Sequence, residues 1–183
     1  MKRTRGFSLL EAMIALLLTS LVAAAVLSSV ISTRDTTNEI GVEHDLVAAA
    51  DHGLAVLENE LRSTALDPAA GLAVTSSFSI TFHVCTGFDT VKNLATYGPA
   101  ITYQFVALPP QNDGIKNEYK LARSFAGGAY QDLIATGLTN PGFGMVNGAL
   151  TVNFNVARNV FLTTTGKRQV RTRAISRTYK VAP

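Results

Sequence analysis

The feature that most constrains this chain is an apolar run near its start, from Phe7 to Ile31. It reads FSLLEAMIALLLTSLVAAAVLSSVI and contains a single charged residue, Glu11. As a helix, about 25 residues rise by roughly 37 Å, which is enough to cross the hydrocarbon core of a bilayer. No later stretch of the sequence is comparable, so we expect one membrane span.

Basic residues in front of the apolar run predict its orientation. Lys2, Arg3 and Arg5 precede the run, and such cationic flanks favour retention of the N-terminus in the cytoplasm. The formal net charge of +3 comes from this cluster, because without these three residues basic and acidic side chains balance. The part of the chain after the span is therefore expected to be exported.

The junction between the basic stretch and the apolar run is unlike an ordinary secretory signal, in which small residues follow the apolar core. Here the basic stretch MKRTRG ends in Gly6, and Phe7 opens the run. Cleavage between Gly6 and Phe7 would leave the whole apolar segment in the mature protein. A carboxylate such as Glu11 at the edge of a hydrocarbon core costs a few kcal/mol, so it tends to mark a function.

The segment from Gly6 to Glu11, GFSLLE, resembles the class III signal of type IV prepilins and type II secretion pseudopilins. In that family a prepilin peptidase cuts after the glycine and methylates the new N-terminal amine, usually that of a phenylalanine. The family's glutamate is fifth in the mature chain and pairs with the N-terminal amine of a neighbouring subunit. The resemblance implies processing at Gly6 and Phe7 and a registry role for Glu11 during assembly. The alternative is an interfacial glutamate in an uncleaved signal anchor.

The helical pattern continues beyond the membrane segment. Apolar residues recur at three- and four-residue steps and form one stripe, with acids on the other faces. The stripe comprises Ile40, Leu46, Ala50, Leu54, Leu57 and Leu61, and the acids are Asp35, Glu39, Glu43, Asp45, Asp51, Glu58 and Glu60. We expect one helix from about Phe7 to about Ser63, ending before Pro68, whose first half projects and whose second half packs on a sheet. Gly41 and Gly53 each weaken it by about 1 kcal/mol relative to alanine and are expected to permit bending.

After Pro68 the apolar pattern changes to that of strands. Alternation of apolar and polar residues predicts strands at 77–84, 101–105, 119–125, 150–156 and 169–181. Turn-forming residues predict loops at 109–114 and 137–148, the second of which includes Asn140-Pro141-Gly142. A long helix followed by antiparallel strands is an α+β arrangement, which is also the pilin architecture. The expected divisions are a cleaved leader (1–6), a transmembrane and filament-core helix (7–31), its amphipathic continuation (32–67) and a β-rich globular domain (68–183).

Two further segments, the pair Leu61-Arg62 and the stretch from Tyr119 to Arg123, resemble PilW-like minor pilins and J-type type II secretion pseudopilins. The resemblance implies a minor pilin that assembles into or primes a type IV pilus, with a type II secretion pseudopilin as the alternative. It implies as partners a prepilin peptidase that is also an N-methyltransferase, other pilins, and the bacterial inner membrane, followed by a periplasmic or cell-surface filament that serves adhesion or motility. A rival of another class is a signal-anchored periplasmic binding module.

The sequence offers no convincing catalytic or metal-binding set, so we expect neither a cofactor nor an enzyme. His44 and His52 are eight residues apart on the predicted helix, about 12 Å along its axis, which is too far to share a metal. His83 and Cys85 share one face of a predicted strand, but a zinc site needs two more ligands. An inert thiol and a hydrogen-bonded histidine are the expected states.

Charge is distributed unevenly along the chain. From Arg158 onward there are seven basic residues and no acid, whereas the segment from Asp35 to Asp67 holds eight acids and one base. Alternation along the last predicted strand places four of the basic residues on one face: Lys167, Arg171, Arg173 and Arg177. We expect this basic face to meet the acidic helix of its own chain or of a neighbouring subunit, or to remain in solvent. The alternative partner is DNA, whose phosphates attract such a stripe.

Overall fold

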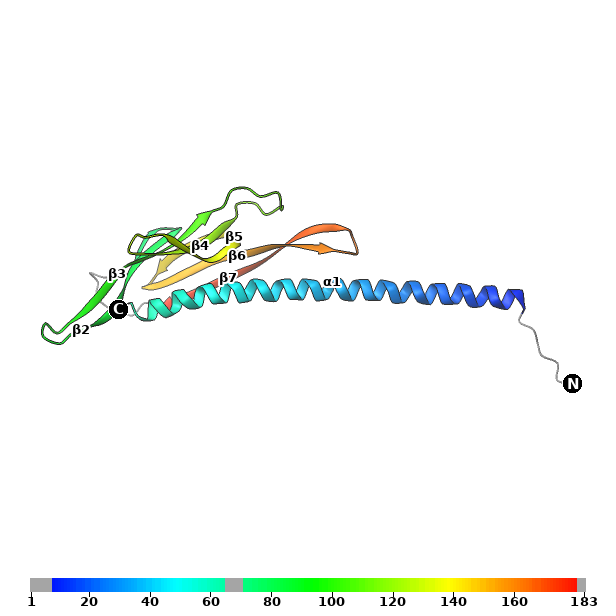
Figure 1. Cartoon of the computed structure of the whole chain (residues 1–183), viewed down its shortest axis with the longest axis horizontal. Coiled ribbons are helices and arrows are strands. Elements are labelled where there is room, and N and C mark those ends of the chain that lie inside the picture. The colour runs from blue at the N-terminus through cyan, green and yellow to red at the C-terminus, as the bar shows by residue number, and fades with distance from the viewer. Residues whose placement is uncertain (1–7, 65–70, 181–183) are drawn as a thin grey trace.

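A computed structural model describes residues 8–64 and 71–180 and places one long helix beside one antiparallel sheet (Figure 1). Each strand pairs with its neighbours in sequence, so the sheet order is β1-β2-β3-β4-β5-β6-β7. The elements are α1 (Leu9–Arg62), β1 (Ala73–Ser76), β2 (Ser79–Asp89), β3 (Leu94–Ala107), β4 (Tyr119–Phe125), β5 (Tyr130–Val146), β6 (Ala149–Leu162) and β7 (Lys167–Lys180). The predicted α+β class, with a long N-terminal helix packed on an antiparallel sheet, is confirmed.

The local sequence explains where α1 begins and ends. Ser8 is its N-cap, and the Ser8 hydroxyl accepts a hydrogen bond from the Glu11 amide at 3.4 Å. Ser63 is its C-cap, so the predicted end of the helix agrees within a residue. The helix has 54 residues, which corresponds to about 80 Å. The predicted start, Phe7, lies outside the described residues.

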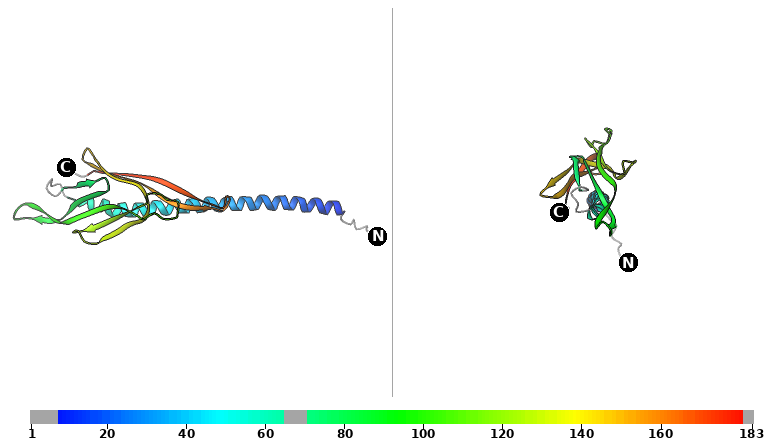
Figure 2. Two further views of the ribbon diagram at one scale, coloured as in Figure 1. Left: turned by 90° about the horizontal axis from the view of Figure 1, so that it is seen from above. Right: turned by 90° about the vertical axis from the view of Figure 1, so that its left-hand side faces the viewer.

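The sheet curls around the second half of α1, which Figure 2 shows along the helix axis. The curl brings the end of β1 to β5, where the Phe143 amide donates to the Ser77 carbonyl at 2.7 Å. β6 and β7 leave the curl as a two-stranded ribbon that runs along α1 towards the N-terminus (Figure 1). The register of this β6–β7 ribbon is continuous from the pair Ala149–Lys180 to the pair Leu162–Lys167.

The hydrophobic core lies between one stripe of α1 and the concave face of the sheet. The stripe supplies Leu46, Ala50, Leu54, Leu57 and Leu61, all buried. Alternate residues of the strands face them, and two of these, Phe82 and Tyr103, stack with ring centroids 5.8 Å apart. Burying an aliphatic or aromatic side chain of this size contributes about 1.5–3 kcal/mol, so this core fixes the sheet on the second half of the helix.

One residue assigned to the apolar stripe does not belong to it. Ile40 is 62% exposed, and the buried stripe begins at Leu46. The reason is its angular position, because Ile40 precedes Leu46 by six residues and therefore lies about 120° away from it around the helix. Val42, which precedes Leu46 by about one turn, is the residue that packs against the core.

The segment 137–148, predicted to be a loop, is mostly strand β5, and this prediction was wrong. The structure keeps the ladder with β6 by a bulge between Thr139 and Gly142. Gly137 and Asn140 adopt positive φ angles of 84° and 49°, and Pro141 lies within the irregular stretch, where a missing backbone donor is tolerated. Residues that usually end a strand therefore bend this one.

The other predicted strands are shifted or extended. Phe78 was expected within a strand that begins at 77, but it lies in the turn between β1 and β2, where its amide donates to the Ser76 hydroxyl at 3.2 Å. β1 itself was not predicted, because four residues are too few to show alternation. β4 agrees with the prediction, while β3 and β6 are longer. β7 begins two residues earlier than expected, and its predicted last residue, Val181, lies outside the described residues.

Candidate functional site

The first half of α1 is an apolar rod that the rest of the chain does not cover. Every side chain in residues 8–30 is exposed. Within the described residues, α1 is the one helix that is long and apolar enough to cross a membrane. Soluble monomers rarely expose apolar patches of more than a few hundred Å², so this surface needs lipid or other helices around it. The predicted projection of the first half of the helix is confirmed.

Two hydroxyl groups inside the apolar run are satisfied by the helix itself. Thr19 donates from Oγ1 to the Ala15 carbonyl at 2.7 Å, and Ser20 donates from Oγ to the Leu17 carbonyl at 2.8 Å. An unsatisfied polar group in hydrocarbon costs several kcal/mol. Because each hydroxyl has an acceptor one turn back, both residues are compatible with a span.

Glu11 occupies the first turn of α1, three residues after the Ser8 cap. This spacing matches the S-x-x-E capping pattern, and a carboxylate there also interacts favourably with the positive end of the helix dipole. The Glu11 side chain is exposed and forms no ion pair with any described residue. Its carboxylate is therefore free for a partner on another molecule. Gly6 and Phe7, the expected processing site, lie outside the described residues.

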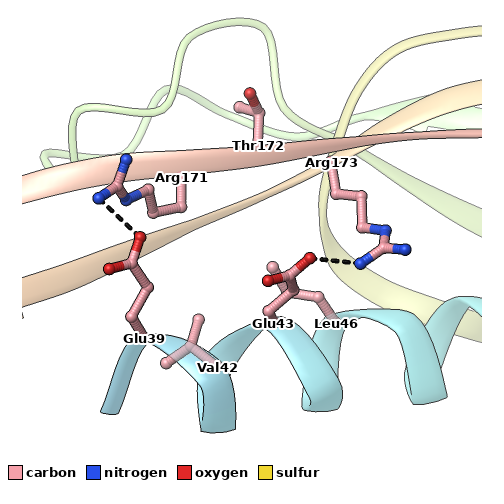
Figure 3. A pocket seen from close by; sticks show the side chains of 7 residues that line it. All are labelled: Glu39, Val42, Glu43, Leu46, Arg171, Thr172 and Arg173. Carbon is pink, nitrogen blue, oxygen red and sulfur yellow. Dashed lines mark hydrogen bonds and ion pairs between the residues drawn. The ribbon is translucent and has the colours of Figure 1, made fainter. Parts of the chain in front are cut away.

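The basic face of β7 meets acidic residues of α1 in the same chain, as Figure 3 shows for two of the pairs. A set of ion pairs links the two elements, and we call it the helix–strand ladder. Its members are Arg171–Glu39 at 2.6 Å, Arg173–Glu43, and Arg177–Asp51 at 3.0 Å. All six side chains are partly exposed, so each pair contributes only about 0.2–1 kcal/mol.

The regular spacing of the ladder follows from helix and strand geometry. Four residues of helix rise by about 6 Å, and two residues of strand rise by about 6.6 Å. A step of four residues along α1 therefore covers nearly the same distance as a step of two residues along β7. By this spacing, the position between the second and third ion pairs falls at Val47 on α1 and at Ile175 on β7, which are both half-buried. One apolar position thus interrupts the helix–strand ladder.

The fourth residue of the predicted basic face is not part of the ladder. Lys167 begins β7 at the ribbon tip, the turn formed by residues 163–166. It is exposed and has no ion-pair partner among residues 8–64 and 71–180. The structure therefore brings three of the four predicted residues to the helix and leaves Lys167 in solvent at the tip.

Asp35 anchors the ribbon tip to the helix, a role that the sequence did not reveal. Its carboxylate accepts hydrogen bonds from the Thr163 and Thr164 amides, both at 2.9 Å, and from the Thr164 hydroxyl at 2.7 Å. The bonds from Thr164, followed by those from Thr163, lower the pKa of Asp35 from 3.8 to about 2. The only hint in the sequence is that Asp35 precedes Glu39 by one helical turn.

A second polar network, which is partly buried, holds the other end of α1 to the sheet. The Glu60 carboxylate accepts from the Tyr103 hydroxyl at 2.6 Å and from Arg123 Nε at 3.1 Å, and a second Arg123 nitrogen binds its other oxygen. Burial, together with the neighbouring Glu60 carboxylate, raises the pKa of Tyr103 well above its usual range. From the sequence, Arg123 appears only in a segment that carries a resemblance, and Glu60 is expected on a helix face opposite the apolar stripe.

His83 and Cys85 each hydrogen-bond to a backbone carbonyl of the β2–β3 hairpin. His83 Nδ1 lies 2.9 Å from the Gly98 carbonyl, and the Cys85 thiol donates to the Gly87 carbonyl at 3.3 Å. Across residues 8–64 and 71–180, no group of three or more His, Cys, Asp or Glu side chains is arranged to hold a metal ion.

Comparison with protein families matches residues 1–27 to the prokaryotic N-terminal methylation motif. Neither a curated protein nor a solved structure matches the chain. The motif implies processing by a prepilin peptidase and assembly with other pilins, and together with the apolar helix it indicates a membrane-anchored N-terminus. The chain therefore carries a type IV pilin-like class III signal at its start and has a pilin-like arrangement, in which a long helix packs on an antiparallel sheet.

Proposed function

We propose that this protein is a minor pilin, a structural and non-enzymatic subunit that assembles into or primes a type IV pilus. In this proposal residues 1–6 are a leader removed between Gly6 and Phe7, and residues 7–31 span the inner membrane with the N-terminus in the cytoplasm. Residues 32–67 continue the helix, and residues 68–183 form the exported domain. After leaving the membrane, the same helix packs in a filament in the periplasm or at the cell surface.

The observation that carries this proposal is the uncovered first half of α1, which continues without a break into the folded domain. A simple membrane tether needs a span but no stiff connection to its domain. A filament subunit needs both, because the helix must carry the domain at a fixed height and angle when it moves from lipid to a bundle of like helices. The 54-residue helix meets that need.

Glu11 supplies the registry step in this proposal. In a dry bundle, its carboxylate would be stabilised by the methylated N-terminal ammonium of a neighbouring subunit, and breaking such a buried pair costs about 3–5 kcal/mol. Subunits out of register would leave the charge unpaired. We therefore expect Glu11 to select the correct axial position.

The first experiment is intact-mass and N-terminal sequence determination of the full chain from membranes with and without a prepilin peptidase. A chain that begins at methylated Phe7 only when the peptidase is present supports the proposal. A Gly6→Leu variant should retain the leader under both conditions. A wild-type chain that still begins at Met1 would instead favour the rival binding module on an uncleaved anchor.

A second experiment tests assembly through Glu11. Glu11→Gln keeps the shape of the side chain but removes its charge, and it should abolish co-purification with other minor pilins. Asp45→Asn is the matched control, because Asp45 is exposed on the same helix and forms no ion pair with described residues. Equal recovery of the complex with both variants would refute the registry role.

A pseudopilin of a type II secretion system would use the same processing, anchoring and registry. The two are separated by phenotype: deletion of a minor pilin removes surface pili, whereas deletion of a pseudopilin leaves exported enzymes in the periplasm. Binding of DNA receives less support, because three of the four residues of the predicted basic face are paired with α1.

A further inference from the structure

The ribbon tip lies at the level where the membrane segment ends. Its two threonine amides bind Asp35, which fixes the tip to one turn of α1. Asp35 follows Ile31, the last residue of the apolar run, by four positions, or about 6 Å along the helix. Ile31 is also the first helix residue after the exposed stretch 8–30 to be partly covered. The β6–β7 ribbon therefore reaches back to the beginning of the polar part of the helix.

The thickness of a bilayer places this tip among lipid headgroups. A bilayer of about 40–45 Å has a hydrocarbon core of about 30 Å, so each headgroup layer is about 5–8 Å thick. A run of about 25 apolar residues is longer than the core and is accommodated by tilt. When the whole run is buried in this way, a point about 6 Å beyond Ile31 lies inside the headgroup layer.

The side chains at this level have the chemistry of a membrane interface. We call the following set the tip cluster: Arg34 of α1, Phe161 of β6, and Lys167 and Arg168 of β7. All four are exposed, and Phe161 and Arg168 lie opposite each other in the ribbon register. None of the three cations forms an ion pair within the described parts of the chain.

Two members of the tip cluster, Arg34 and Phe161, line a hollow between the ribbon and the helix. Asn38 and Thr163 line it as well. The cations of the tip cluster have no acidic partner among the described residues. The nearest helix acids, Asp35 and Glu39, are already bound by the ribbon. An anion from outside the chain is the missing partner, and basic groups beside an aromatic ring suit a phosphate at a lipid surface.

We propose that the tip cluster binds the phosphate groups of anionic phospholipids in the same membrane that holds the α1 span. This inference rests on the proposed membrane anchoring. The contact sets the height and rotation of the exported domain above the bilayer before the subunit leaves it. Extraction into a filament then breaks the lipid contact, while the helix–strand ladder remains intact within the subunit.

The test uses the full chain reconstituted into phosphatidylcholine vesicles with or without phosphatidylglycerol. Thr165 lies in the exposed turn of the ribbon tip, so Thr165→Cys in a Cys85→Ser background provides one site for an environment-sensitive fluorophore. Quenching by headgroup-labelled lipid reports contact between the tip and the bilayer. Carbonate extraction of the same vesicles reports anchoring independently of that contact.

The test variant is Lys167→Gln/Arg168→Gln, and the matched control is Lys92→Gln/Lys180→Gln. The control removes the same charge from two exposed lysines, one in the turn between β2 and β3 and the other at the end of β7 opposite the tip. Because each basic residue near an anionic surface contributes about fivefold to association, the test variant should weaken tip contact by about 25-fold, and the control should not change it. The contact should require phosphatidylglycerol and decrease at high salt.

The outcomes separate the two proposals. Strong quenching in phosphatidylglycerol vesicles that the test variant alone removes supports lipid binding. Quenching that is the same in both vesicles, or equally affected by both variants, overturns it even when the chain resists carbonate. Loss of the lipid-dependent quenching when equimolar duplex DNA is added overturns it in favour of DNA. Release of the chain by carbonate shows that the anchoring proposal itself has failed, and the lipid inference fails with it.

Discussion

Replacing Gly53 by alanine should reveal how closely α1 approaches β5, because the two glycines inside the helix differ in their surroundings. A Cβ added at Gly53 would lie 2.6 Å from Ile134 Cγ1 and 3.0 Å from Ile134 Cδ1, whereas one added at Gly41 would meet nothing within 4 Å. Ile134 is only 4% exposed and belongs to the core, so it has little room to move. Its branched side chain is also stiff about χ1.

The expected magnitudes follow from this contrast. Either substitution gains about 1 kcal/mol of helix propensity. Gly53→Ala also incurs an overpacking cost of about 1–3 kcal/mol. Gly41→Ala should therefore raise the melting temperature by about 2–4 °C, and Gly53→Ala should fall below it by roughly 2–12 °C. The propensity gain cancels in the difference, which isolates the contact between helix and strand.

The assay is thermal unfolding of the full chain in detergent, followed by the β-sheet circular dichroism signal. Ile134→Ala serves as the background for a double-mutant cycle, since it removes both side-chain atoms that the new methyl group would meet. In that background Gly53→Ala should become neutral or stabilising, with a coupling of about 1–3 kcal/mol. If Gly53→Ala stabilises the wild-type chain as much as Gly41→Ala does, the close approach of α1 and β5 is wrong.

Three further predictions concern the polar contacts. The pKa of Asp35 is lowered from 3.8 to about 2, so the stability that its carboxylate contributes is complete above about pH 4 and is lost as the pH falls towards 2. The Thr164 amide should therefore exchange hydrogen faster over that pH range, and in Asp35→Asn it should exchange fast already at neutral pH. Tyr103→Phe removes a hydrogen bond to the Glu60 carboxylate and should lower stability by about 1.5 kcal/mol. In an absorbance titration, two tyrosines, Tyr103 and Tyr179, should ionise at higher pH in the folded wild type than in the unfolded chain, and Tyr103→Phe should leave only one of them. High salt should accelerate hydrogen exchange in β7, which the partly exposed ladder holds to α1, and leave β3 unchanged; equal effects on both strands would contradict the ladder's role.

The helix and the fold class could be predicted because their signals are local. The apolar run and the three- and four-residue steps that follow it define α1, and alternation defines most strands. β5 was missed because Gly137, Asn140 and Pro141 usually end strands, and the bulge that accommodates them depends on pairing with β6. Gly53 shows the same limit: its sequence position indicates a weak point in a helix, but its use for close packing is set by a residue about eighty positions away.

The site was predictable in its charges but not in its pairing. The excess of acids on the helix and of bases on the last strand is visible in the sequence. Whether they meet in one chain or between chains depends on the match between a helical turn and two strand residues, which only the assembled fold establishes. Asp35 was missed because its partners are backbone amides of a turn. Nearly every residue type has a backbone amide, so the sequence does not show which of them will bind a carboxylate.

The consecutive order of the strands has a consequence for folding during export. A chain that reaches the periplasm gradually can pair each new strand with the one before it, so β1 to β6 need no late rearrangement. The ladder is different, because it joins Glu39 near the start of the domain to Arg171 in β7, and it cannot close until that strand has been delivered. A subunit interrupted before β7 would keep much of its core but display a row of uncompensated acids along its helix. Closure of the ladder therefore reports that translocation of the subunit has passed its seventh strand, and it gives the assembly machinery an electrostatic difference between finished and unfinished subunits.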